Sequence, residues 1–147
     1  MKVIVSACLL GRNCKYNGGN NFDEGVTAFL EGKEVIPVCP EELAGLGVPR
    51  VPMEIVNGVL INRDGVTVDA PVRTAVAQIL KEIQDQPIEC AILKSRSPTC
   101  GVRQVYDGTF TGTLTDGNGT LAQALIDKGY TVLSNEDIQS FISKGSL

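Results

Sequence analysis

Residues 69–93 read DAPVRTAVAQILKEIQDQPIECAIL, and this stretch predicts a helix followed at once by a buried strand. Its apolar residues recur at i, i+4, i+7, i+8 and i+11, on one face of a helix: Val72, Val76, Ile79, Leu80 and Ile83. Asp69 is the expected N-cap and Pro87 the expected stop. The run Ile88–Leu93 then predicts a core strand. A helix that leads directly into a buried strand is typical of an α/β fold.

The rest of the chain repeats this alternation. Further strands are expected at Val3–Ala7, Glu34–Val38 and Tyr130–Leu133, and further helices at Phe22–Leu30, Leu121–Lys128 and Glu136–Ser143. Residues 53–68 predict a β-hairpin excursion, because Asn57-Gly58 and Asp64-Gly65 are hairpin-turn dipeptides. We therefore expect one domain over residues 1–147, with a mostly parallel, Rossmann-like sheet flanked by helices.

Composition argues against several classes of protein. Lys plus Arg is 13 and Asp plus Glu is 17, so the net charge is −4, and aromatic residues make up only 5%. An acidic chain without a basic block does not predict a polymeric nucleic-acid partner. No apolar run approaches the ~20 residues of a membrane span. The apolar start is broken at Gly11-Arg12-Asn13, too early for a signal peptide, so we expect a cytoplasmic protein.

Three of the five cysteines follow the ends of predicted strands. Cys8, Cys39 and Cys100 each lie at or just after such an end, and ligands of open α/β sheets bind outside the carboxyl ends of the strands. We therefore expect these thiols to converge at one crevice. Cys90 lies inside a predicted strand and is expected to pack in the core. Cys14 lies in a polar loop, as a fourth ligand, a redox partner or a bystander.

The chain has no histidine, which excludes Ser-His and Cys-His nucleophile pairs and histidine-containing zinc sites. A thiol-rich crevice can then hold zinc, structurally with Cys14 as fourth ligand or catalytically with three ligands. It can equally hold a 4Fe–4S cluster on three cysteines with one iron left open. Spacing alone does not choose between these metals.

Four short motifs, in order along almost the whole chain, resemble a known family. They are SACLLG at 6–11, CPE at 39–41 with Gly45, PRxP at 49–52 and KxxSPxCG at 94–101. The family is a bacterial domain of unknown function that includes an iron–sulfur-dependent thiouracil desulfidase. After the first motif this chain has Lys15 and Asn17 where many relatives are expected to have Arg and Asp. These departures bear on substrate identity more than on cluster binding.

The resemblance implies a 4Fe–4S cluster held by three cysteines, which match Cys8, Cys39 and Cys100, with one open iron. It also implies that Glu41 is a catalytic acid/base and that Ser97 contacts the substrate. The implied reaction is a redox-neutral desulfidase reaction on a small thiolated heterocycle such as thiouracil: C=S becomes C=O and sulfide is released. We expect a monomer or homodimer. The alternative is a non-catalytic iron–sulfur or zinc module with a sensing or structural role.

Overall fold

The computed structural model describes residues 1–143, and its centre is a parallel sheet of four strands. The strands are β1 (Lys2–Ser6), β2 (Glu34–Val38), β5 (Ile88–Leu93) and β8 (Val132–Ser134), in the order β2-β1-β5-β8. Every pairing is parallel, with Ser6 opposite Val38 at one end of the β1–β2 ladder. The predicted α/β fold is confirmed. Pro37 is tolerated because β2 is an edge strand.

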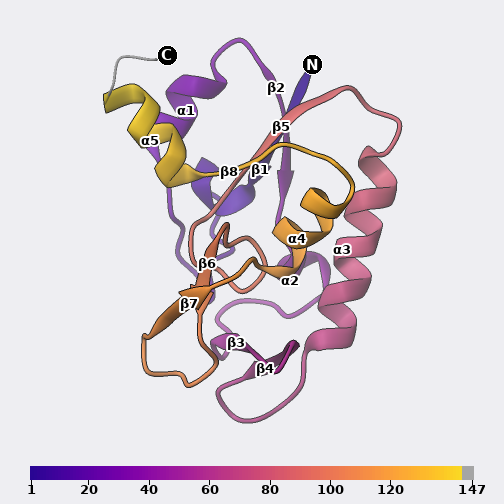
Figure 1. The fold of residues 1–147 in the computed structure, drawn as a ribbon, viewed down its shortest axis with the longest axis vertical. Coiled ribbons are helices and arrows are strands. Elements are labelled where there is room, and N and C mark those ends of the chain that lie inside the picture. The colour runs from indigo at the N-terminus through magenta and orange to yellow at the C-terminus, as the bar shows by residue number, and fades with distance from the viewer. Residues whose placement is uncertain (144–147) are drawn as a thin grey trace.

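Helices cover both faces of this sheet (Figure 1). Helices α1 (Glu24–Leu30) and α5 (Asn135–Ser143) pack on one face, against the side chains of Val3 and Val5. Helices α2 (Pro40–Leu43), α3 (Asp69–Ile83) and α4 (Thr120–Asp127) lie on the other face, where Ile4 points. The alternation of buried residues along β1 follows from the two-residue period of a strand. Within residues 1–143, the helices are too short or too polar to cross a membrane.

Helix α3 confirms the predicted periodicity, because Val72, Val76, Ile79 and Ile83 are buried in the core. The expected N-cap is wrong. Asp69 is the first residue of the helix, and its carboxylate accepts a hydrogen bond from the Leu60 backbone N–H at 3.0 Å and pairs with Arg73 at 2.9 Å. A carboxylate in the first turn still favours the helix through its dipole.

Two antiparallel hairpins extend from the sheet. The first joins β3 (Met53–Val56) to β4 (Val59–Asn62), and its turn residues Asn57 and Gly58 have φ of 50° and 80°. Two consecutive positive φ values define the type I′ turn that the Asn-Gly dipeptide predicts. The second joins β6 (Gln104–Tyr106) to β7 (Leu114–Asp116), two strands that are not among those the sequence predicted.

The strand order creates a binding crevice at one edge of the sheet. The chain passes from β1 to β2 on one side and then crosses to β5 on the other side of β1, so the strand order reverses between β1 and β5. Ligands of open α/β sheets bind outside the carboxyl ends of the strands at such a switch point. Both hairpins lie beyond these carboxyl ends, in the lower half of Figure 1.

Candidate functional site

A pocket of about 480 Å³ lies at this edge of the sheet. Residues from the carboxyl ends of β1, β2 and β5 and from both hairpins line it, and four cysteines are among them: Cys8, Cys14, Cys39 and Cys100. All five cysteines of the chain are free thiols. Cys90 lies instead in β5, packed against the α1 and α5 side of the sheet. The structure thus brings together the three predicted thiols and adds Cys14 to them.

Each predicted thiol is held by the local structure of its own segment. Cys8 lies in a single turn of 3-10 helix (Ala7–Leu10) that follows β1 directly. Cys39 is the N-cap residue of α2, and its carbonyl oxygen accepts the Leu43 N–H at 3.0 Å. Cys100 ends the KSRSPTC loop that follows β5. Three strand-to-loop transitions therefore supply three sulfur atoms to one crevice.

The loop before Cys100 is fixed from inside and from outside. The Ser97 hydroxyl oxygen accepts the backbone N–H groups of Thr99 at 3.2 Å and Cys100 at 3.1 Å. The first N–H groups of α4 donate to carbonyl oxygens of the loop, Thr120 to Pro98 at 3.0 Å and Leu121 to Thr99 at 2.8 Å. These bonds satisfy donors that a helix start otherwise leaves free, so the loop and α4 stabilise each other.

Glu41 points into the pocket and is 9% exposed. One carboxylate oxygen accepts a short hydrogen bond from the Thr99 hydroxyl, and the other lies 3.5 Å from Arg50 Nη2 and 3.7 Å from Cys39 Sγ. The Thr99 hydroxyl lies 3.0 Å from the Ser97 hydroxyl. Because Thr99 donates its proton to Glu41, the Ser97 hydroxyl donates to Thr99. Ser97, Thr99 and Glu41 form one chain of hydrogen bonds.

The thiols lie in surroundings that disfavour a bare negative charge. Burial raises the pKa of Cys100 to about 12, and the nearby Glu41 carboxylate also raises it. Burial likewise raises the pKa of Cys39, with Glu41 the second cause, and the pKa of Cys8, against a hydrogen bond from Asn21 that lowers it. Burial lowers the pKa of Lys94, although neighbouring Cys8 opposes this shift. A bound metal supplies the positive charge that such thiolates need.

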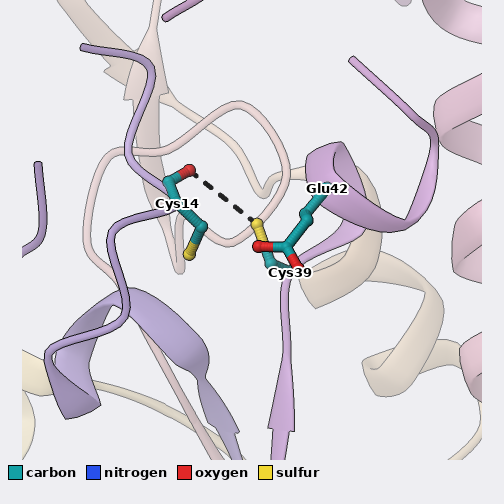
Figure 2. Close-up of side chains that lie close together, drawn as sticks. All are labelled: Cys14, Cys39 and Glu42. Carbon is teal, nitrogen blue, oxygen red and sulfur yellow. Dashed lines mark hydrogen bonds between the residues drawn. The ribbon is translucent and has the colours of Figure 1, made fainter. Parts of the chain in front are cut away.

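The donor set fits an iron–sulfur cluster. Such clusters are held by cysteine thiolates, and this pocket offers free sulfur atoms from several segments at one place. Within residues 1–143 a different group of potential ligands also lies close together: Cys14 Sγ, Cys39 Sγ and a Glu42 carboxylate oxygen are all within 4.8 Å of one another (Figure 2). Two overlapping sets of potential ligands therefore share Cys39: the three predicted thiols, which line the pocket, and a second set whose Glu42 lies outside the pocket lining.

Two residues hold Glu41 in place, and the sequence alone assigned a role to neither of them. They are Thr99 and Arg50. Both lie inside quoted motifs, Thr99 between Ser97 and Cys100 and Arg50 in the PRxP motif, so their position was the available signal. Arg50 also donates to the Cys14 carbonyl oxygen at 3.0 Å. It thereby connects the Cys14 loop to the catalytic candidate Glu41.

The second hairpin supplies an aromatic wall that the sequence did not indicate. Tyr106 and Phe110 line the pocket. The Phe110 loop is fastened by Glu54 of β3, a 9% exposed residue whose carboxylate accepts the N–H groups of Gly108 at 2.9 Å and Phe110 at 3.2 Å. Gly108 has a φ of 92°, and a Cβ there would lie 2.6 Å from the Ile55 carbonyl oxygen. Phe110 has a φ of 58°, a strained conformation that the Glu54 bonds maintain.

Fold and site define an α/β protein with a thiol-lined pocket at the carboxyl edge of a parallel sheet. The family model described as 2-thiouracil desulfurase matches residues 3–137, and the chain belongs to this family. The uncharacterized protein YbbK of Bacillus subtilis (strain 168) is 31% identical over 150 residues, covering 95% of this chain and 99% of YbbK. A solved structure of the [4Fe-4S]-dependent thiouracil desulfidase TudS (DUF523Vcz) superimposes with a TM-score of 0.87 at 31% identity, covering 99% and 97% of the two chains. The resemblance seen in the sequence is confirmed.

Proposed function

We propose that this chain is a 4Fe–4S-dependent desulfidase that converts the C=S group of a thiolated nucleobase such as thiouracil into C=O. The overall reaction is C=S plus water giving C=O plus hydrogen sulfide, so no electrons are gained or lost. The observation that carries the proposal is the shared pocket of Cys8, Cys39, Cys100 and Glu41, in a chain similar to a [4Fe-4S]-dependent desulfidase.

In this proposal Cys8, Cys39 and Cys100 hold the cluster. When bound, it supplies an iron atom without a protein ligand, a Lewis acid for the substrate's sulfur. The three thiols come from three different strand ends, so the sheet edge itself spaces them. Their pocket is wide enough to admit a small heterocycle as well, since it also includes the hairpin wall.

Glu41 is the proposed proton carrier. Its carboxylate takes a proton from the attacking water and returns it to the departing sulfur, which is general acid–base catalysis by a positioned group. The hydrogen bond from Thr99 and the contact with Arg50 hold this carboxylate from two sides. With no histidine in the chain, Glu41 is the titratable oxygen group closest to the Cys39 sulfur that also lies in the pocket.

Ser97 is the proposed substrate contact. Its hydroxyl oxygen accepts two backbone N–H groups, which fixes the oxygen at the pocket wall. Its single proton points along the chain toward Thr99 and can turn toward a polar atom of the heterocycle, because a hydroxyl hydrogen rotates freely. Tyr106 and Phe110 offer aromatic faces on which a planar ring can stack.

Anaerobic reconstitution of the full chain, followed by iron and sulfide analysis and a thiouracil turnover assay, tests the proposal. We expect about four iron and four sulfide per chain, as for a 4Fe–4S cluster, with uracil and sulfide as products. Cys39→Ala should lose both cluster and activity, whereas the matched control Cys90→Ala should keep both. A cluster without turnover would indicate a non-catalytic iron–sulfur module, and failure of the metal-free chain to form a cluster when no zinc is present would indicate a zinc domain; either result refutes the proposal.

A further inference from the structure

Cys14 lies beside Cys39 without belonging to the proposed cluster ligands. Its sulfur, the Cys39 sulfur and a Glu42 carboxylate oxygen are mutually within 4.8 Å. Figure 2 shows the Glu42 carboxylate next to the Cys39 sulfur, and the Cys14 carbonyl oxygen, from a separate loop, accepting the Cys39 thiol at 4.0 Å. Cys14 is 3% exposed, so its thiol is placed by the protein interior and not by solvent.

Both loops that carry these ligands are held in place. The Cys14 N–H donates to the Arg12 carbonyl oxygen at 2.9 Å, and the Cys14 carbonyl oxygen accepts Arg50 Nη2 at 3.0 Å. Cys39 and Glu42 belong to one turn of α2, with Cys39 as its N-cap. The ligand atoms therefore need only small side-chain rotations to contract around an ion.

The donor set matches a thiophilic divalent ion. Two thiolates and one carboxylate, with water in the fourth position, form a four-coordinate zinc site with Zn–S of about 2.3 Å and Zn–O of about 2.1 Å. Two sulfur atoms bound to one zinc ion at tetrahedral angles are roughly 3.8 Å apart. The ligand atoms here lie within 4.8 Å of one another, so they need to approach by at most about 1 Å. Glu42 is exposed enough for water to reach the fourth position.

Arg12 already orients the carboxylate. Its guanidinium forms a two-pronged ion pair with Glu42, with Nε 3.1 Å from Oε2 and Nη2 on Oε1. Carboxylate oxygens have further lone pairs, so Glu42 can bind a metal while it remains bonded to Arg12. Ligating carboxylates commonly carry such an outer hydrogen bond.

We propose that, in the cluster-free chain, Cys14, Cys39 and Glu42 bind one Zn²⁺ ion. This site shares only Cys39 with the proposed cluster set. One thiolate bound to zinc is unavailable to iron, so zinc and cluster exclude each other, and zinc holds the chain in a form that does not accept iron. The zinc site stands without the proposed function; only the competition rests on it.

The test uses the full-length, reduced, metal-free chain under argon. Co²⁺ is the spectroscopic probe, because its sulfur charge-transfer absorption scales with the number of bound thiolates, and Zn²⁺ competition then gives the zinc affinity. We expect one ion per chain on two thiolates. Cys14→Ser should halve the thiolate absorption and weaken zinc binding by more than about a hundredfold, because the loss of a residue that only hydrogen-bonds to a metal ligand already costs about 10–100-fold. Glu42→Gln should weaken zinc binding while the thiolate absorption is unchanged.

Two control variants separate this site from the cluster ligands. Cys100→Ser and Cys90→Ser should bind zinc like the parent chain, because neither thiol belongs to the trio. The proposal is overturned if Cys100→Ser loses zinc as Cys14→Ser does. It is also overturned if Glu42→Gln, a substitution at an exposed position, leaves the zinc affinity unchanged. Zinc added before iron should slow iron uptake in the parent chain and not in Cys14→Ser. If no cluster ever forms, the proposed function fails, while the zinc titrations still decide this inference.

Discussion

Gly119 is the N-cap residue of α4 and packs against the loop that carries Cys100. Gly119→Ala adds one methyl group at this contact and tests how the loop is held. A Cβ at this position would lie 2.4 Å from the Thr99 carbonyl carbon, 2.5 Å from its oxygen and 2.7 Å from the Cys100 nitrogen. The Gly119 φ of −65° is open to any residue, so the backbone itself does not oppose alanine. Close packing against the loop is the sole reason for glycine here, and Gly119→Ala perturbs only that.

The size of the effect follows from these distances. Carbon atoms pack at about 3.5–4.0 Å, so the loop and the start of α4 must separate by roughly 1 Å. That movement stretches the bonds from Thr120 and Leu121 to the loop carbonyl oxygens. Overpacking of this kind costs about 1–3 kcal/mol. In a domain of this size each kcal/mol lowers the midpoint of thermal unfolding by about 2–4 °C, so we expect a decrease of about 2–12 °C.

Thermal unfolding of the metal-free chain and iron content after anaerobic reconstitution measure the two consequences. Gly119→Ala should unfold at a lower temperature and take up less iron, because Cys100 moves with the loop. The matched control is Gly19→Ala, whose Cβ would meet only the Asn17 side chain, at 3.1 Å. The packing argument is refuted if Gly119→Ala unfolds at the parent temperature with full iron content.

Three further predictions test Glu41 positioning, the aromatic wall and the start of α5. Thr99→Val removes the hydroxyl that donates to Glu41. A hydrogen bond to a charged group contributes about 1.5–3 kcal/mol, so kcat should fall about tenfold to a hundredfold at unchanged iron content. Thr99→Ser should recover the lost kcat. Phe110→Ala should raise the KM for thiouracil by about tenfold, because stacking of a base contributes about 1–3 kcal/mol, and an unchanged KM would remove Phe110 from the site. Burial raises the pKa of Asp137, but hydrogen bonds from Arg103 and Ser134 outweigh it and hold the pKa below its ordinary 3.8. This carboxylate therefore stabilises the fold at neutral pH, and the stabilisation is lost as the pH falls through the lowered pKa. Asp137→Asn should therefore cost about 1 kcal/mol at pH 7, and denaturant titrations should show the difference shrinking below pH 3.8; a difference that persists in acid would contradict the assignment.

The sheet, its principal helices and the first hairpin could be predicted because their signals are local. The periodicity of α3 and the Asn57-Gly58 turn each lie within one short stretch of sequence. The second hairpin could not, since strands of three residues with polar sequence carry no period long enough to recognise. The position of this hairpin depends on Glu54, whose carboxylate accepts the Gly108 N–H although the two residues are 54 positions apart in the sequence.

The sulfur-lined crevice was predictable for a geometric reason. Parallel strands end at the same edge, so residues that follow them meet without any knowledge of side-chain packing. The hydrogen-bond partners of Glu41 could not be predicted. Thr99 is 58 residues away in the sequence, and its bond to Glu41 depends on how the Cys100 loop packs against α4. Strand ends are thus visible in sequence, whereas the hydrogen bonds between them are a property of tertiary packing.

The position of α2 explains how one short segment serves two ligand sets. Successive residues of a helix are rotated by about 100°, so Glu41 and Glu42 leave the turn in different directions. Glu41 points to Thr99 and the pocket, and Glu42 points to Arg12 and the side of Cys39 that faces Cys14. Cys39 therefore has a carboxylate on each side, the one proposed to move protons and the one proposed to bind zinc. Under these two proposals, the metal that binds the Cys39 thiolate determines which of the two carboxylates takes part.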